Sequence, residues 1–70
     1  MFSSAVEMLQ EGHAPKDVAA ATGLSQSACR RYATVIRTLA ADPAAPIDPK
    51  RAVISAAMVE PIRHWAASAR

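Results

Sequence analysis

The chain has 70 residues, 51% of them hydrophobic, and a formal net charge of +2 at pH 7. This length indicates one small domain, which buries only about 60% of its unfolded surface and is marginally stable alone. The single cysteine excludes an internal disulfide and favours a reducing cytoplasm, and neither a signal peptide nor an apolar run near the roughly 20 residues of a membrane span is present.

The first predicted element is a helix over residues 3–12. Ser4 followed by Glu7 has the spacing of a capping box, and apolar residues recur after it at helical spacing. Gly12 is expected to end the helix. We expect this helix to be a scaffold that packs across the next two.

A second, short helix is predicted over residues 15–22. Pro15 suits its first position, because the missing N–H costs nothing there and φ is already helical. Gly23 can take the left-handed conformation that closes the last turn. Leu24 is then placed to pack between two helices, and Ser25 is a natural N-cap for the helix that follows.

The third predicted helix covers residues 26–41 and is basic. Its apolar residues recur at three- and four-residue spacing, which is one stripe of a helix, and its arginines fall off that stripe. No acidic residue occurs between Asp17 and Asp42, so the local charge is positive even though the net charge is small. The stripe consists of Cys29, Tyr32, Ile36 and Leu39.

A short helix, a glycine turn and a longer basic helix form the helix-turn-helix pattern. In this pattern, the outer face near the start of the second helix contacts base edges in the major groove of DNA. Arginine can bind guanine through two hydrogen bonds and glutamine can bind adenine in the same way. We expect the backbone contacts to include Lys16 and Arg37. The other predicted DNA-contacting residues are Ser25, Gln26, Ser27, Arg30 and Arg31.

The segment from Ala5 to Leu39 resembles a known family. Its sequence, AVEMLQEGHAPKDVAAATGLSQSACRRYATVIRTL, is similar to the three-helix DNA-binding unit of bacterial recombinases, transposase heads and small phage or plasmid repressors. The resemblance covers about half of the chain and is carried mainly by TGLSQSACRRY. It implies an all-α fold, a recognition helix that starts at Gln26, and double-stranded DNA as the partner.

Residues 42–48 are predicted to connect this unit to a C-terminal helix. Pro43, Pro46 and Pro49 recur at every third position, which favours a stiff, extended, polyproline-like segment. Proline at position 43 also disfavours helix at Asp42, so the third helix should end near there.

The last predicted helix covers residues 49–68. Asp48 is its expected N-cap, and Pro61 is expected to kink the helix or split it near Val59 and Glu60. Lys50 and Arg51 lie in its first turn, where the helix dipole disfavours positive charge. Two interpretations stay open: the pair contacts phosphate, or solvent screens a small penalty.

The apolar stripe of this C-terminal helix is larger than a domain of this size needs. It either closes the core of its own chain or forms a two-fold dimer, which would place two recognition helices about one DNA turn apart and match a palindromic operator. We favour the dimer. Its predicted interface consists of Ile54, Met58, Ile62 and Trp65.

Catalytic and metal sites are not expected. His13, Cys29 and His64 lack the spacing of metal ligands, and the sequence has no paired carboxylates, no nucleophile with an adjacent base and no glycine-rich phosphate loop. One residue each of Phe, Tyr and Trp is too few for a stacking platform that binds single strands. No enzyme activity and no cofactor are therefore predicted.

Together these patterns predict a cytoplasmic, sequence-specific, double-stranded DNA-binding transcriptional regulator. A dimer of phage or mobile-element type would act as a repressor by occluding a promoter, although the sequence does not distinguish repression from activation. A second interpretation is a small helical module that binds and inhibits another regulator or enzyme. A third is a fragment of a recombinase or small terminase, which would require a catalytic domain outside this sequence.

Overall fold

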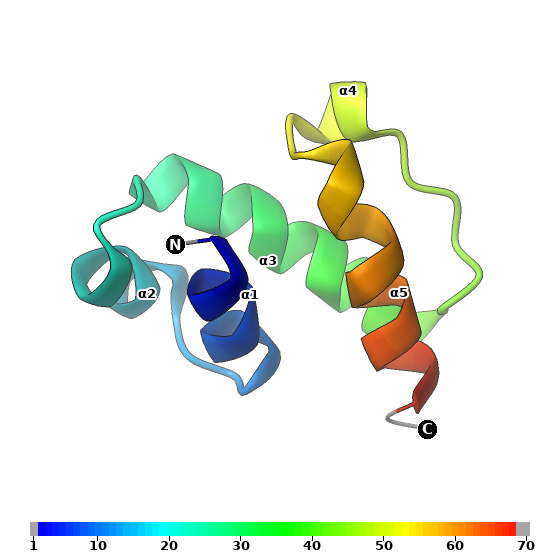
Figure 1. The fold of residues 1–70 in the computed structure, drawn as a ribbon, viewed down its shortest axis with the longest axis horizontal. Helices are drawn as coiled ribbons and strands as arrows, with labels where there is room; N and C mark the ends of the chain where they lie inside the picture. Colours follow the sequence, from blue (N-terminus) through cyan, green and yellow to red (C-terminus); the bar gives the residue numbers. More distant parts are fainter. Residues whose placement is uncertain (1, 69–70) are drawn as a thin grey trace. The chain divides into compact units, whose positions relative to one another are not determined.

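The regular structure of the chain is helical throughout the residues that the computed structural model describes, which are residues 2–68, with side-chain burial described from Ser4 onward. The prediction of an all-α chain is therefore confirmed for these residues. No helix among them is both long and apolar enough to cross a lipid bilayer. In chain order the elements are α1 (Phe2–Gln10), α2 (Pro15–Thr22), α3 (Gln26–Ala41), α4 (Pro49–Ala52), the short 3-10 helix η1 (Ala56–Met58) and α5 (Val59–Ser68), as Figure 1 shows.

The chain divides into two compact units, Met1–Ala33 and Thr34–Arg70, which we call the N-terminal and C-terminal units. The division falls inside α3, where neither glycine nor proline marks a boundary in the sequence. Each unit contributes buried apolar side chains. In the N-terminal unit these are Ala5, Val6, Leu9, Val18, Cys29 and Tyr32, and in the C-terminal unit they are Val35, Ile36, Leu39, Val59, Ile62 and Ala66.

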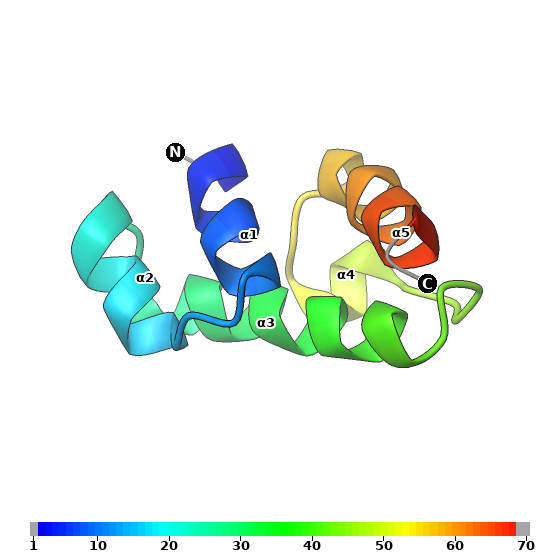
Figure 2. The same ribbon diagram turned by 90° about the horizontal axis from the view of Figure 1, so that it is seen from below.

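In the N-terminal unit, α1 packs against α2, and Figure 2 shows both on the same side of the first half of α3. The helix begins at Phe2, so Ser4 lies inside its first turn and the predicted capping box, which needs Ser4 before the helix, is wrong. The helix ends at Gln10, two residues before the predicted end. Two backbone hydrogen bonds close the end of the helix. The N–H of Gly12, which has φ 99°, donates to the Leu9 carbonyl, and the N–H of His13 donates to the Met8 carbonyl, both at 3.1 Å.

The connection between α2 and α3 is a three-residue turn, and both helices have the predicted bounds. Gly23 has φ 81°, a left-handed conformation, and its N–H donates to the Ala19 carbonyl at 2.9 Å. The hydroxyl of Ser25 accepts a hydrogen bond from the Ala28 N–H at 3.1 Å, which caps α3 as expected. The C-cap of α2 at Gly23 and the N-cap of α3 at Ser25 therefore fix where α3 begins.

In the C-terminal unit, the proline-containing connection starts with a turn. The Asp42 carbonyl accepts a hydrogen bond from the Ala45 N–H at 3.0 Å, and its carboxylate accepts one from the Ala44 N–H at 3.1 Å. This is the local turn that Asp followed by Pro favours. The prediction that the segment is extended from its start is therefore wrong, although α3 does end at Ala41, just before this turn.

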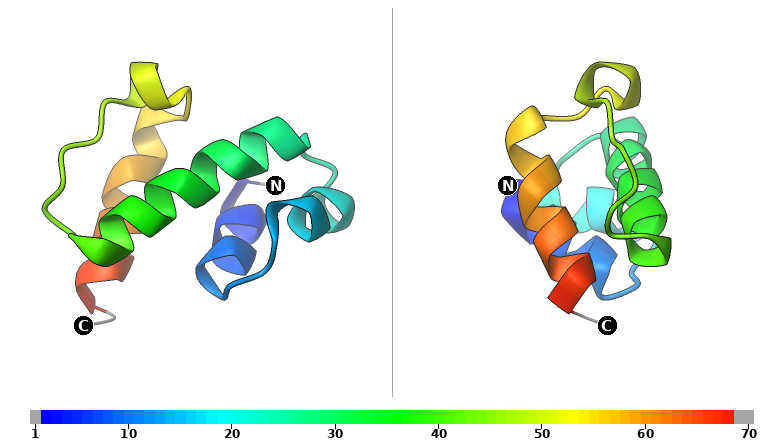
Figure 3. Two further views of the ribbon diagram at one scale, coloured as in Figure 1. Left: turned by 180° about the vertical axis from the view of Figure 1, so that it is seen from behind. Right: turned by 90° about the vertical axis from the view of Figure 1, so that its right-hand side faces the viewer.

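The predicted helix over residues 49–68 is three shorter elements. Asp48 caps α4 by accepting a hydrogen bond from the Lys50 N–H at 3.0 Å, as predicted, but α4 ends after one turn. Val53 then takes a left-handed conformation (φ 56°, ψ 50°) that turns the chain toward η1. Pro61 lies in the first turn of α5, where the missing N–H is tolerated, and α5 begins at Val59, where the split near Val59 and Glu60 was predicted. The earlier break at Val53 was not predicted. Figure 3 shows α5 beside the second half of α3.

Replacing Val53 with glycine is expected to stabilise the chain. A β-branched residue in the left-handed region costs roughly 1–2 kcal/mol, whereas glycine adopts this conformation without strain. Glycine also gives the unfolded chain more conformational freedom, which lowers the stability by at most about 1 kcal/mol. Because the Val53 side chain is 61% exposed, little packing is lost. Urea denaturation should show a gain of about 0.5–1 kcal/mol. Val53→Ala is the control, since it removes the same side chain but keeps the left-handed strain; an equal gain there would contradict the explanation.

Candidate nucleic-acid interface

The polar residues predicted to contact bases lie at the start of α3. Its first turn contains no acidic residue. Four of the five side chains are exposed and one, Arg31, is half-buried. The exposed ones are Ser25, Gln26, Ser27 and Arg30. The N-terminal unit therefore brings five of the seven predicted DNA-contacting residues onto one short stretch of backbone.

The helical period explains why these side chains face outward. Cys29 and Tyr32 are 1% and 3% exposed, so they define the buried side of the first half of α3. At 3.6 residues per turn, Ser27 falls nearly opposite that side, and Arg30 and Arg31 lie on either side of Ser27. Burial of two apolar residues therefore fixes the direction of the polar ones.

Ser25, Gln26 and Arg30 already make side-chain hydrogen bonds within the chain. Arg30 Nη2 donates to Gln26 Oε1 at 3.3 Å, one helical turn back. The Ser25 hydroxyl oxygen accepts the capping hydrogen bond from Ala28. Since a hydroxyl carries one proton, Ser25 can cap the helix as an acceptor while donating to a phosphate oxygen.

Lys16 is exposed in the first turn of α2, as the prediction of a backbone contact requires. The N-cap residue of α2 is Ala14, which has no side-chain group to cap the helix, and Pro15 has no N–H. No side chain therefore caps the start of this helix, which lies next to an exposed lysine. Asp17 is exposed in the same turn and would repel a phosphate placed close to it.

The remaining predicted phosphate contacts belong to the C-terminal unit. Arg37, Lys50 and Arg51 are all exposed. The reason for assigning Lys50 and Arg51 to phosphate was their position at the positive end of a long helix. Because α4 has only four residues, its first and last turns coincide and that reason is lost. Screening by solvent is sufficient to explain both charges.

The four residues predicted to form a dimer interface are not equally accessible. Ile62 is 0% exposed, so its side chain is part of the core of this chain and its assignment to the interface is wrong. Ile54, Met58 and Trp65 are half-buried. Val53 is the one large hydrophobic side chain that is exposed among those described.

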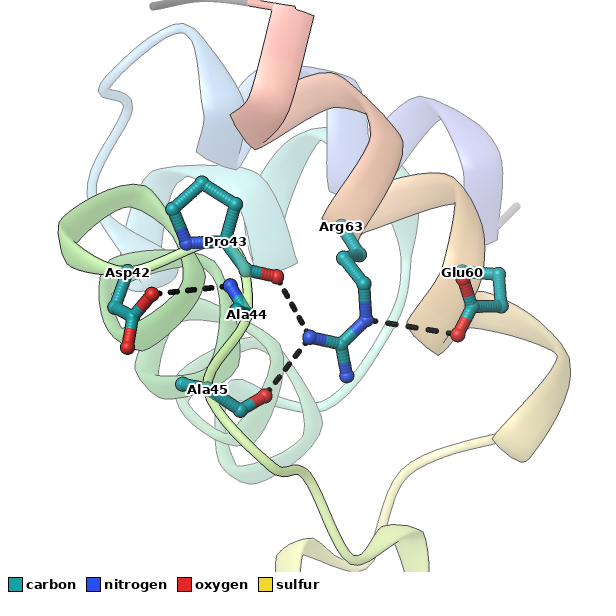
Figure 4. A network of polar contacts seen from close by, with 6 residues as sticks. All are labelled: Asp42, Pro43, Ala44, Ala45, Glu60 and Arg63. Carbon is teal, nitrogen blue, oxygen red and sulfur yellow. Dashed lines mark hydrogen bonds and ion pairs between the residues drawn. The ribbon is translucent and has the colours of Figure 1, made fainter.

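Arg63 is a residue whose role the sequence pattern did not reveal. Its Nη1 donates to the carbonyls of Pro43 and Ala45, at 2.6 and 2.9 Å, and its Nε lies 3.5 Å from Glu60 Oε1 (Figure 4). These contacts tie α5 to the turn that follows α3. A proline-containing turn leaves carbonyls without helical partners, and this is the sequence signal that could have suggested a nearby arginine.

Metal-binding groups do not gather anywhere in residues 2–68: no cluster holds three or more His, Cys, Asp or Glu side chains. Cys29 is a free thiol that is 1% exposed and packs as a small hydrophobic residue. The exposed polar start of α3 is therefore the feature from which a function can be argued.

Comparison of the chain with protein-family models, with curated proteins and with solved structures gives no match in any of the three. Its function must therefore be inferred from its own residues.

Proposed function

We propose that the protein is a sequence-specific, double-stranded DNA-binding regulator in which α2, its turn and α3 act as a helix-turn-helix. The observation that carries this proposal is the start of α3, which exposes amide, hydroxyl and guanidinium groups and has no acidic residue in its first turn. These are the groups that bind base edges and phosphates. An α-helix of about 10–12 Å diameter fits the roughly 12 Å width of the major groove.

In this proposal the residues divide between two tasks. Gln26, Ser27, Arg30 and Arg31 contact base edges, because their side chains leave the outer face of the first two turns of α3. Ser25 and Lys16 contact phosphates, the first through its hydroxyl proton and the second beside the uncapped start of α2. Arg37, seven residues after Arg30 on the same helix, is a further phosphate contact.

Dimerisation completes the proposed mechanism. A single module would neutralise few phosphates and bind weakly at physiological salt. Two copies would bind a palindromic operator together and cover apolar side chains that one copy leaves accessible, namely exposed Val53 and half-buried Ile54, Met58 and Trp65. The dimer would then repress by occluding a promoter.

Replacing Arg31 with alanine is expected to reduce the preference for a specific duplex, by removing discrimination at the base pair that Arg31 contacts, while the helical fold is retained. One bidentate arginine–guanine contact discriminates against the wrong base by about 1–3 kcal/mol, which is roughly 5- to 150-fold in affinity. The measurement is fluorescence anisotropy on a duplex selected from a random pool and on a scrambled duplex, each over a series of salt concentrations. Circular dichroism checks that each variant folds.

Arg51→Ala is the matched control, because it removes the same charge from a residue outside the proposed interface. It should change the affinity much less than Arg31→Ala and should leave the preference between duplexes intact. Equal losses for the two variants would show that only net charge matters. Absence of binding by the unaltered protein at low salt would refute the DNA-binding proposal itself.

One observation favours a second candidate function, a protein-interaction module that inhibits another regulator or enzyme. Val53 is an exposed apolar residue in a strained conformation, and such combinations occur at binding sites. If this is the function, Arg31→Ala will be silent and replacement of Trp65 will abolish capture of the partner.

A further inference from the structure

We propose that Gln26 and Arg30 form one reading unit that selects guanine over adenine at the base pair facing Gln26. This inference rests on the proposed DNA-binding function and adds the identity of one base in its target. The observation that carries it is the hydrogen bond from Arg30 Nη2 to Gln26 Oε1 at 3.3 Å.

The chemistry of the two side chains fixes which end of the Gln26 amide faces Arg30. A guanidinium has only donors, so the atom that it contacts must be the amide oxygen and not the amide nitrogen. The Gln26 NH2 group is then directed away from Arg30. The four-residue spacing places the two side chains one above the other on the helix surface, so the contact forms before any base is bound.

The same hydrogen bond changes what the Gln26 amide can recognise. Binding adenine through two hydrogen bonds requires the amide oxygen to accept from N6 and the amide nitrogen to donate to N7. In this protein a charged donor already occupies the oxygen and withdraws electron density from it, which weakens it as an acceptor and strengthens the NH2 group as a donor. Guanine offers two acceptors, O6 and N7, to such a donor.

The base preference of a glutamine without a neighbouring arginine is the opposite one. A glutamine taken alone pairs best with adenine, so the identity of Gln26 by itself would predict an adenine at this position. The contact with Arg30 reverses that expectation, because the pair presents donors where glutamine alone presents one donor and one acceptor. Arg30 is therefore a specificity-determining residue that acts partly through Gln26.

The test is selection of binding sites from a random duplex pool with the full chain, followed by affinities for the selected site with each base pair at each position. Gln26→Ala identifies the position that Gln26 reads, as the one whose base preference disappears. We expect guanine to be favoured there over adenine by about tenfold in the unaltered protein. A preference for adenine would overturn the inference and leave the DNA-binding proposal standing.

Arg30→Ala is the decisive variant. It releases the Gln26 oxygen, so the preference at this position should change from guanine to adenine even though overall binding weakens. Arg31→Ala is the matched control: it removes the neighbouring arginine but not the contact with Gln26, so guanine should still be preferred at this position wherever binding is measurable at low salt. An unchanged guanine-to-adenine ratio in Arg30→Ala would overturn the inference. A pool that yields no enriched sequence would overturn the proposed function and this inference with it.

Discussion

Replacing Leu39 with alanine is expected to unfold a large fraction of the protein under conditions in which the unaltered chain is folded. Leu39 lies in the second half of α3 and is 0% exposed. Truncation of a buried leucine costs about 2–5 kcal/mol, because the lost apolar contacts leave a cavity that neighbours fill only partly. A core of this size rarely supplies more than about 3–5 kcal/mol in total. Urea denaturation followed by far-ultraviolet circular dichroism measures the loss.

Thr38→Ala is the control for Leu39→Ala, since it changes the adjacent residue on the exposed side of the same helix. Its hydroxyl donates only to the Thr34 carbonyl, four residues back, a contact that contributes little to helix stability. The unfolding free energy should therefore change by no more than about 0.5 kcal/mol. If Leu39→Ala were equally harmless, the buried side chains of the C-terminal unit would not be what stabilises it.

The sequence predicted α2 and α3 well because local chemistry sets their ends. Pro15, Gly23 and Ser25 each act on backbone groups within a few residues of themselves, so no knowledge of the rest of the chain is needed. The direction of the polar face of α3 followed in the same way from two buried residues, Cys29 and Tyr32, at helical spacing. The exposed side chains at the start of α3 were predictable for this reason.

The C-terminal region was less predictable because packing, and not local sequence, determines where its helices end. Helical periodicity continued through Val53 and Ile54, and nothing in that pattern indicates that a valine takes the left-handed conformation and ends α4. The boundary predicted near Val59 and Glu60 is present, because α5 begins at Val59 with Pro61 in its first turn. Two errors followed from the missed break at Val53: the dipole argument for Lys50 and Arg51, and the predicted length of the helix.

Arg63→Ala is expected to destabilise the C-terminal unit by about 2–3 kcal/mol, since hydrogen bonds to charged groups contribute about 1.5–3 kcal/mol and their loss leaves acceptors with poor access to water. The guanidinium donates through Nη1 to the carbonyls of Pro43 and Ala45, and both contacts are partly buried. Proline has no N–H and cannot extend a helix, so this turn obtains its polar partners from α5. Urea denaturation gives the free energy, and the carbonyl carbon shifts of Pro43 and Ala45 report the two contacts directly.

Two further variants separate the hydrogen bonds of Arg63 from its ion pair. Glu60→Gln removes only the charge partner, whose side chain is 82% exposed, so the unfolding free energy should change by no more than about 0.5 kcal/mol. Arg63→Lys keeps the charge but replaces the planar fork by a single ammonium group, which matches two carbonyls less well, so we expect it to recover less than half of the loss. If Glu60→Gln were as damaging as Arg63→Ala, the ion pair and not the backbone carbonyls would be the source of the stability. Full recovery by lysine would show that positive charge, without the guanidinium geometry, holds α5 to the turn after α3.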